Sequence, residues 1–123
     1  MRVRIPSRLL AKLYVKGSLC NRAEGFALTM KNVLAPGSAT AFLGLDVDGV
    51  GYPLEQVSLS VDGLGTIEAT KISSQAPLPL GLGCRVVVTV EGEKLAPGPH
   101  DVVIRFRTKE VGEVRLPIRD SID

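Results

Sequence analysis

Apolar residues recur at every second position in several strand-length segments of the chain. The segment 57–61 is the clearest, because Val57, Leu59 and Val61 alternate with serines. Successive side chains of a strand point to opposite faces, so this alternation predicts a strand with one buried face. The same pattern, weaker in one segment, recurs at 26–34, 41–47, 67–72, 86–90, 100–109 and 114–118.

Glycine-containing turns separate these segments. Asp48-Gly49 and Asp62-Gly63 each follow a predicted strand, and Asp-Gly is a preferred pair for tight β-hairpins. The tetrapeptide Leu-Ala-Pro-Gly precedes a long predicted strand twice, at 34–37 and at 95–98. Either it marks a degenerate internal repeat, or two Pro-Gly turns coincide. The segment 76–81 contains two prolines and is expected to be an extended loop without regular pairing.

One short helix is expected, over residues 8–11 with Ser7 as its cap, and the alternation of Leu13, Val15 and Leu19 predicts a strand after it. About eight strands at this spacing are typical of an all-β fold. We therefore predict an antiparallel β-sandwich of the jelly-roll type. A chain of 123 residues fits one domain with one core, 1–123.

Composition disfavours autonomous binding of glycans or nucleic acid, because only 4% of the residues are aromatic and Trp is absent. Six Lys and Arg residues precede the first acid, Glu24, and form a basic N-terminal arm (1–23) on a chain of net charge +2. Such an arm can contact nucleic acid or an anionic membrane, and it also resembles a transit peptide. We favour packing on the acidic body of the chain or a partner. The absence of a secretory signal or a long apolar stretch predicts a cytoplasmic protein without nucleic-acid or membrane contacts.

The sequence contains no recognisable catalytic, cofactor or metal motif. His100 is the only imidazole, and it is expected to make structural hydrogen bonds, with a proton donor at a shared site as the alternative. The stretch Asp46-Val47-Asp48-Gly49 lacks the later ligands of a calcium loop and predicts a hairpin turn. Cys20 and Cys84 are expected to be small buried thiols, although a disulfide between them is possible.

Apolar side chains also fall on strand faces that should be wet. These residues are Tyr14, Val33, Phe42, Val87 and Val103, which lie opposite the core-facing set of their segments. A sandwich has one dry interior, and several outward apolar residues on different strands indicate a covered surface. We interpret the five as a partner interface.

Turn residues and apolar positions across most of the chain carry a family resemblance. They are Gly17-Ser18-Leu19, Asn21, Gly25-Phe26, Lys31-Asn32, Val47-Asp48-Gly49 and Val61-Asp62-Gly63. This pattern resembles the small β subunits of bacterial C-glycoside deglycosidases. The resemblance implies a β-sandwich that assembles with a larger barrel-type subunit carrying the metal and the acid-base residues, so that this chain would be a non-catalytic accessory subunit of a carbohydrate-active enzyme. A homo-oligomeric binding or structural module is the alternative, and a small enzyme acting through His100 is the third hypothesis.

Overall fold

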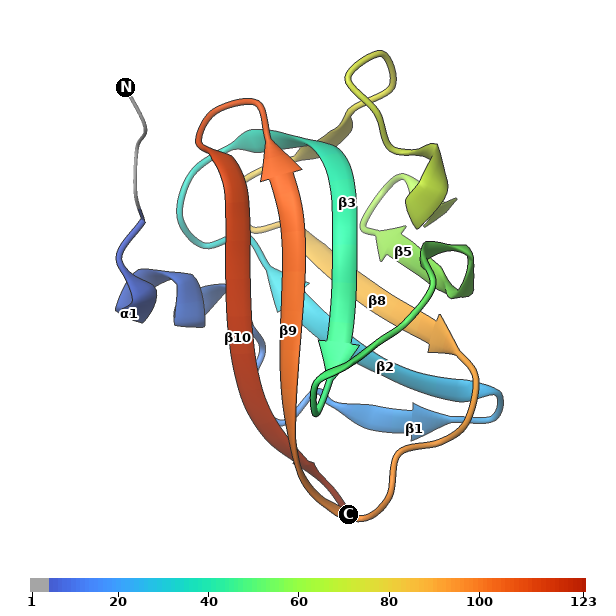
Figure 1. Cartoon of the computed structure of the whole chain (residues 1–123). Helices are drawn as coiled ribbons and strands as arrows, with labels where there is room; N and C mark the ends of the chain where they lie inside the picture. The colour runs from blue at the N-terminus through green and yellow to red at the C-terminus, as the bar shows by residue number, and fades with distance from the viewer. Residues whose placement is uncertain (1–4) are drawn as a thin grey trace.

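Two antiparallel sheets packed face to face make up the computed structural model, which describes residues 5–123 (Figure 1). The first sheet has the order β1-β2-β8-β5-β6, with β1 Cys20–Arg22, β2 Gly25–Lys31, β8 Arg85–Glu91, β5 Val57–Val61 and β6 Gly65–Glu68. The second has the order β10-β9-β3-β4, with β10 Gly112–Ile122, β9 Gly98–Thr108, β3 Gly37–Val47 and β4 Val50–Gly51. The predicted all-β sandwich is confirmed, with ten strands in place of eight.

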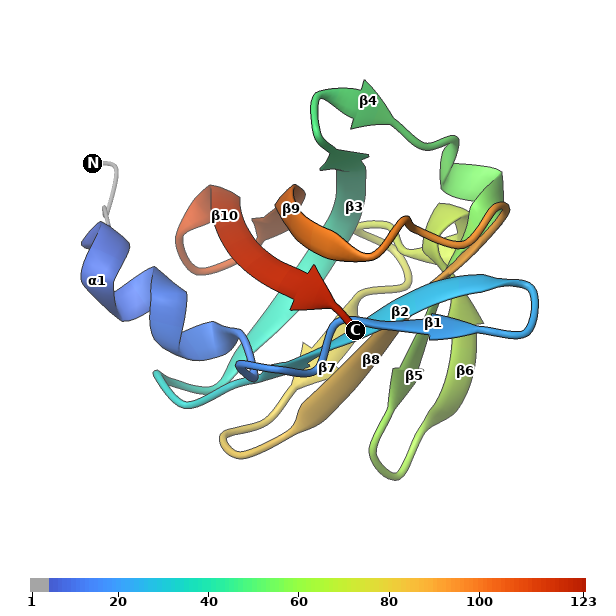
Figure 2. The same cartoon turned by 90° about the horizontal axis from the view of Figure 1, so that it is seen from below.

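Residues 7–13 lie beside β10, and those of the turn 11–13 contact both β10 and β2 (Figure 2). Helix α1 (Ser7–Leu10) confirms the expected helical segment, but Pro6 occupies the cap position and no side-chain hydrogen bond caps the helix. A 3₁₀ turn, η1 (Ala11–Leu13), follows it. The strand expected over residues 13–19 is wrong, since only a single bridge from Tyr14 to Met30 pairs this segment with β2. The basic residues Arg2 and Arg4 lie outside the described residues.

The predicted hairpin turn is confirmed at Asp48-Gly49, which connects the paired strands β3 and β4. Both residues of this turn have positive φ, 51° and 83°. The expectation that 76–81 avoids pairing is wrong in part. Strand β7 (Leu78–Leu80) pairs with the start of β3. Asn32 supports this arrangement, because its side-chain amide donates to Ala35 O at 2.8 Å and to Leu80 O at 2.9 Å. Two further 3₁₀ turns are η2 (Leu54–Gln56) and η3 (Ala69–Lys71).

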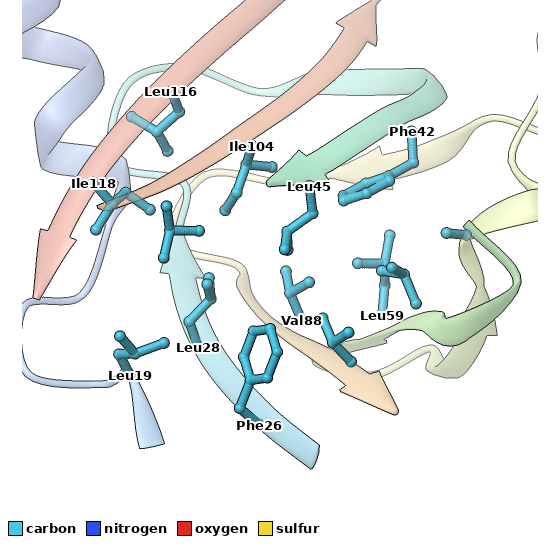
Figure 3. Close-up of a cluster of buried hydrophobic side chains, with 14 of the residues drawn as sticks. Leu19, Phe26, Leu28, Phe42, Leu45, Leu59, Val88, Ile104, Leu116 and Ile118 are labelled. Atoms are coloured by element: carbon cyan, nitrogen blue, oxygen red, sulfur yellow. The ribbon is translucent and has the colours of Figure 1, made fainter. Parts of the chain in front are cut away.

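Aliphatic side chains from both sheets fill the space between them (Figure 3). Phe26, Leu45, Ile104 and Leu116 are almost completely buried. No charged or polar residue is buried among residues 5–123. The core is therefore made as composition predicts, from β-branched and leucine side chains on pleated surfaces.

Strand β3 breaks the alternation that its sequence predicts. Its pairing with β9 shifts register between Ala39 and Ala41 and again between Phe42 and Gly44. Each bulge adds a residue and moves the following side chains to the other face. Phe42 is consequently 7% exposed and packs in the core. Its expected outward position is wrong for this reason.

Candidate functional site

His100 lies near the start of β9, at the end of the sandwich that carries the β3–β4 turn. Its Nδ1 is 2.6 Å from Asp48 Oδ2, and its Nε2 is 2.7 Å from the carbonyl oxygen of Ala96. Asp48 also accepts a hydrogen bond of 2.9 Å from the backbone N–H of Asp101. These bonds join the β3–β4 turn to the loop before β9.

The pKa values of both His100 and Asp48 are shifted. The Ala96 carbonyl, followed by the Asp48 carboxylate, raises the pKa of His100 above 6.5, because each stabilises the protonated ring. The Asp101 N–H, followed by His100, lowers the pKa of Asp48 below 3.8. With both ring nitrogens engaged inside the fold, the imidazole has the structural role that the sequence favoured.

A second polar contact ties the N-terminal segment to β10. The Tyr14 hydroxyl donates to Asp120 Oδ2 at 2.5 Å, and the N–H of Gly17 donates to the same oxygen at 2.7 Å. Burial, followed by the hydrogen bond to Asp120, raises the pKa of Tyr14 to about 12. The Tyr14 hydroxyl lowers the pKa of Asp120 in turn. Tyr14 and Gly17 therefore fix their segment against β10, and the contact of Tyr14 with a partner stays a prediction.

The other residues of the expected interface are spread over the surface. Val33 is 42% exposed in the turn after β2, whereas Val87 and Val103 are half-buried on different sheets. Their contact with a partner also stays a prediction.

Two exposed leucines were missed by the strand patterns. Leu64 is 51% and Leu82 63% exposed, and each stands between two glycines in a turn. Together with Val33 they form a surface that we call the glycine-leucine patch (Val33, Leu64 and Leu82). A large apolar residue flanked by glycines in a predicted turn is the sequence signal that could have found it, because such a position has no strand face to bury it.

The turns of the glycine-leucine patch lie side by side. They follow or precede β2, β8 and β5, which are neighbours in one sheet, and neighbouring strands are about 4.8 Å apart. Backbone hydrogen bonds link Asn32 N to Cys84 O at 2.9 Å and Asp62 N to Arg85 O at 3.2 Å. Figure 2 shows these turns at the same end of the sheet.

An apolar cavity of about 170 Å³ lies between the sheets. Its inner wall includes Phe42, Leu59, Val88 and Ile104, which are all buried. The segment 34–38 and the β9–β10 turn, which contains the exposed Glu110, form its outer boundary. Phe42 belongs to this cavity, which the strict alternation in β3 could not reveal.

Other chemistry is sparse in the described part of the chain. No group of three or more His, Cys, Asp or Glu side chains within residues 5–123 is placed to hold a metal ion. Both cysteines are free, and Cys20 is exposed, so its expected burial is wrong and the possible disulfide is not formed. No helix within residues 5–123 combines the length and the apolarity needed to cross a membrane.

The molecule is thus a two-sheet β-sandwich with an apolar cavity and an exposed patch of glycine-flanked leucines. Residues 9–123 match the family model described as Hydroxymethylglutaryl-CoA reductase, N-terminal domain. The chain belongs to this family. Comparison with curated proteins finds no match.

This family membership overturns the resemblance to the β subunits of C-glycoside deglycosidases, and with it the accessory role in such an enzyme. The physical reason lies in the residues that carried the resemblance. Gly17, Gly25, Gly49 and Gly63 all have positive φ in turns or at strand starts. Many antiparallel sandwiches need glycine there, so the pattern identifies turns and not a family.

Proposed function

We propose that the chain is a non-catalytic N-terminal domain that binds the catalytic part of a hydroxymethylglutaryl-CoA reductase through the glycine-leucine patch. The observation that carries this proposal is the exposure of Leu64 and Leu82 on adjacent, hydrogen-bonded turns. The name of the family supplies the partner.

Exposed leucines on neighbouring turns favour a docked state. Burying one leucine side chain fully contributes roughly 1.5–3 kcal/mol. Exposed apolar side chains gathered at one end of a sheet are typical of an interaction site, whereas single scattered residues are ordinary. Gly63, Gly65 and Gly83 have positive φ near 80°, which lets each turn present its leucine at the tip.

The rim of the patch is polar, as in other protein interfaces. Lys31 and Arg85 are directly paired across β2 and β8, immediately before and after the turns that carry Val33 and Leu82. A stable interface buries more than about 1,200 Å² in total. The patch therefore acts as the apolar centre of a larger surface, with these cations at its edge and acidic groups of the partner facing them.

A non-catalytic role agrees with the state of the polar side chains. His100 uses both ring nitrogens in hydrogen bonds to Asp48 and Ala96. The carboxylate of Asp120 accepts hydrogen bonds from the Tyr14 hydroxyl and the Gly17 N–H. The proposed contribution of the chain is to hold or position the catalytic part.

Copurification with the catalytic part of a hydroxymethylglutaryl-CoA reductase tests this proposal. We expect Leu64→Asp combined with Leu82→Asp to weaken association by at least about tenfold, since an interface would desolvate both carboxylates. Val50→Asp is the matched control, because Val50 is also 63% exposed but lies at the β3–β4 turn, at the other end of β3. Equal loss in the control, unchanged binding in the double variant, or recovery of the chain only as a homo-oligomer would contradict the proposal.

A further inference from the structure

The cavity between the sheets has walls of two kinds. Leu59, Val88 and Ile104 are at most 4% exposed and form a fixed inner wall on three strands. Toward the outer boundary the wall is made by partly buried side chains, among them the unbranched Met30 and, in the segment between β2 and β3, Leu34. Unbranched or loop-borne side chains of this kind change rotamer more easily than packed strand residues. The cavity can therefore admit a guest at that side.

Two polar side chains at the boundary make hydrogen bonds within the protein. Glu110 Oε1 accepts the N–H of Ser38 at 2.9 Å, and Thr108 Oγ1 donates to Gly112 O at 3.2 Å. No buried side-chain nitrogen or oxygen within residues 5–123 lacks a hydrogen-bond partner. The buried wall therefore offers a polar guest no unpaired side-chain nitrogen or oxygen to compensate for its lost hydration, and it selects an apolar guest.

The volume of the cavity limits the size of the guest. Its volume of about 170 Å³ is close to that of apolar cavities of about 150 Å³ that stay dry and bind benzene. A void of this kind deprives its lining of dispersion contacts, and a guest of matching volume restores them.

We propose that this cavity is a binding site for a short, uncharged apolar group of about six carbon atoms. The apolar end lies against Leu59, Val88 and Ile104, and any hydroxyl or other polar end remains at the boundary formed by residues 34–38. Val33, Leu64 and Leu82 do not line this cavity, so binding of the guest can be tested independently of the association with a reductase.

The wild-type chain with n-hexanol as the probe gives the direct test. In methyl NMR spectra we expect saturable shifts of Leu59, Val88 and Ile104, whereas Leu45 and Ile118, which belong to the core but not to the cavity lining, stay in place. The hexanediol with a hydroxyl at each end is the matched ligand, and it should bind at least about tenfold more weakly because one hydroxyl must be desolvated. Equal binding of the diol, no saturation, or uniform shifts across the core would overturn the proposal.

A variant with a filled cavity provides a second test of the proposal. Ala39 lines the cavity and is 5% exposed, so Ala39→Leu should occupy the space and abolish hexanol binding. Ala76→Leu makes the same change at an exposed position outside the lining and should bind hexanol as the wild type does. Retained binding in a folded Ala39→Leu variant would place the guest elsewhere. If that variant does not fold, the wild-type spectra and the diol comparison decide.

Discussion

At the scale of single residues, the His100–Asp48 pair makes stability depend on pH. The pKa of His100 is raised above 6.5, so its contribution is fully present below pH 6.5 and is lost as pH rises through the folded-state pKa. The pKa of Asp48 is lowered below 3.8, so its contribution is present above pH 3.8 and is lost as pH falls through the folded-state pKa. The two contributions coincide between about pH 3.8 and 6.5.

We expect Asp48→Asn to lower the free energy of unfolding more at about pH 5 than at about pH 9, measured by urea unfolding. Asparagine tolerates the positive φ of 51° at this position and keeps an acceptor for the N–H of Asp101, so the substitution removes mainly the charge. Asp101→Asn is the control, because its ion pair with Arg119 is 63% and 68% exposed and contributes little. An equal loss of unfolding free energy at both pH values would show that the charge of Asp48 does not stabilise its contact with His100.

At the scale of secondary-structure elements, the close approach of β2 to β8 depends on Gly25. A Cβ at Gly25 would lie 1.9 Å from the backbone oxygen of Val90, and its φ is +154°. Gly44 is the matched position, because a Cβ there would meet only the flexible guanidinium of Arg105, and its φ is not positive. Gly25→Ala should cost at least about 2 kcal/mol of unfolding free energy, and Gly44→Ala should change it by less than about 1 kcal/mol. Chemical denaturation of both variants checks this, and equal costs would refute it.

The same elements show how much the sequence determines. Strands β5, β8, β9 and β10 follow their alternation because each has one face on the core and pairs in register with a neighbour. In β2, Phe26 and Leu28 face the core as predicted, but Ala27 between them is buried as well. In β3, the first bulge turns Phe42 inward and the second restores the predicted face, so that Leu45 and Val47 are buried as expected. Bulges leave no local signal when the bulged residue is not a glycine with positive φ. Phe42 was therefore misplaced, and the cavity that it lines could not be predicted.

Segments stabilised by distant contacts were also beyond local prediction. Residues 14–19 alternate like a strand, yet Tyr14 and Gly17 bind Asp120, more than 100 residues away in the sequence. The segment pairs with β2 through a single bridge, from Tyr14 to Met30. Leu64 and Leu82 carry a readable signal, the flanking glycines, but only the sheet order brings their turns together. Pairing order between strands is a property of the whole chain and is not encoded in any one segment.

At the scale of the whole molecule, the segment 5–13 and the two sheets together border the apolar cavity. Ile5 and Leu13 line it from the side of α1 and η1 (Figure 2). Leu13 is 9% exposed, so removing its side chain enlarges the cavity without reaching the inner wall. We therefore expect Leu13 to affect both the stability of the sandwich and the room available to a guest.

Leu13→Ala should lower the free energy of unfolding by about 2–5 kcal/mol, since a buried leucine is replaced by a void. Saturating n-hexanol should restore part of this loss and raise the melting temperature of the variant more than that of the wild type, because the guest fills the added space. Leu19→Ala is the control: Leu19 is 4% exposed in the same core but does not line the cavity, so hexanol should stabilise this variant no more than the wild type. Equal rescue of both variants in thermal unfolding would mean that the N-terminal segment packs against the sandwich without bounding the site.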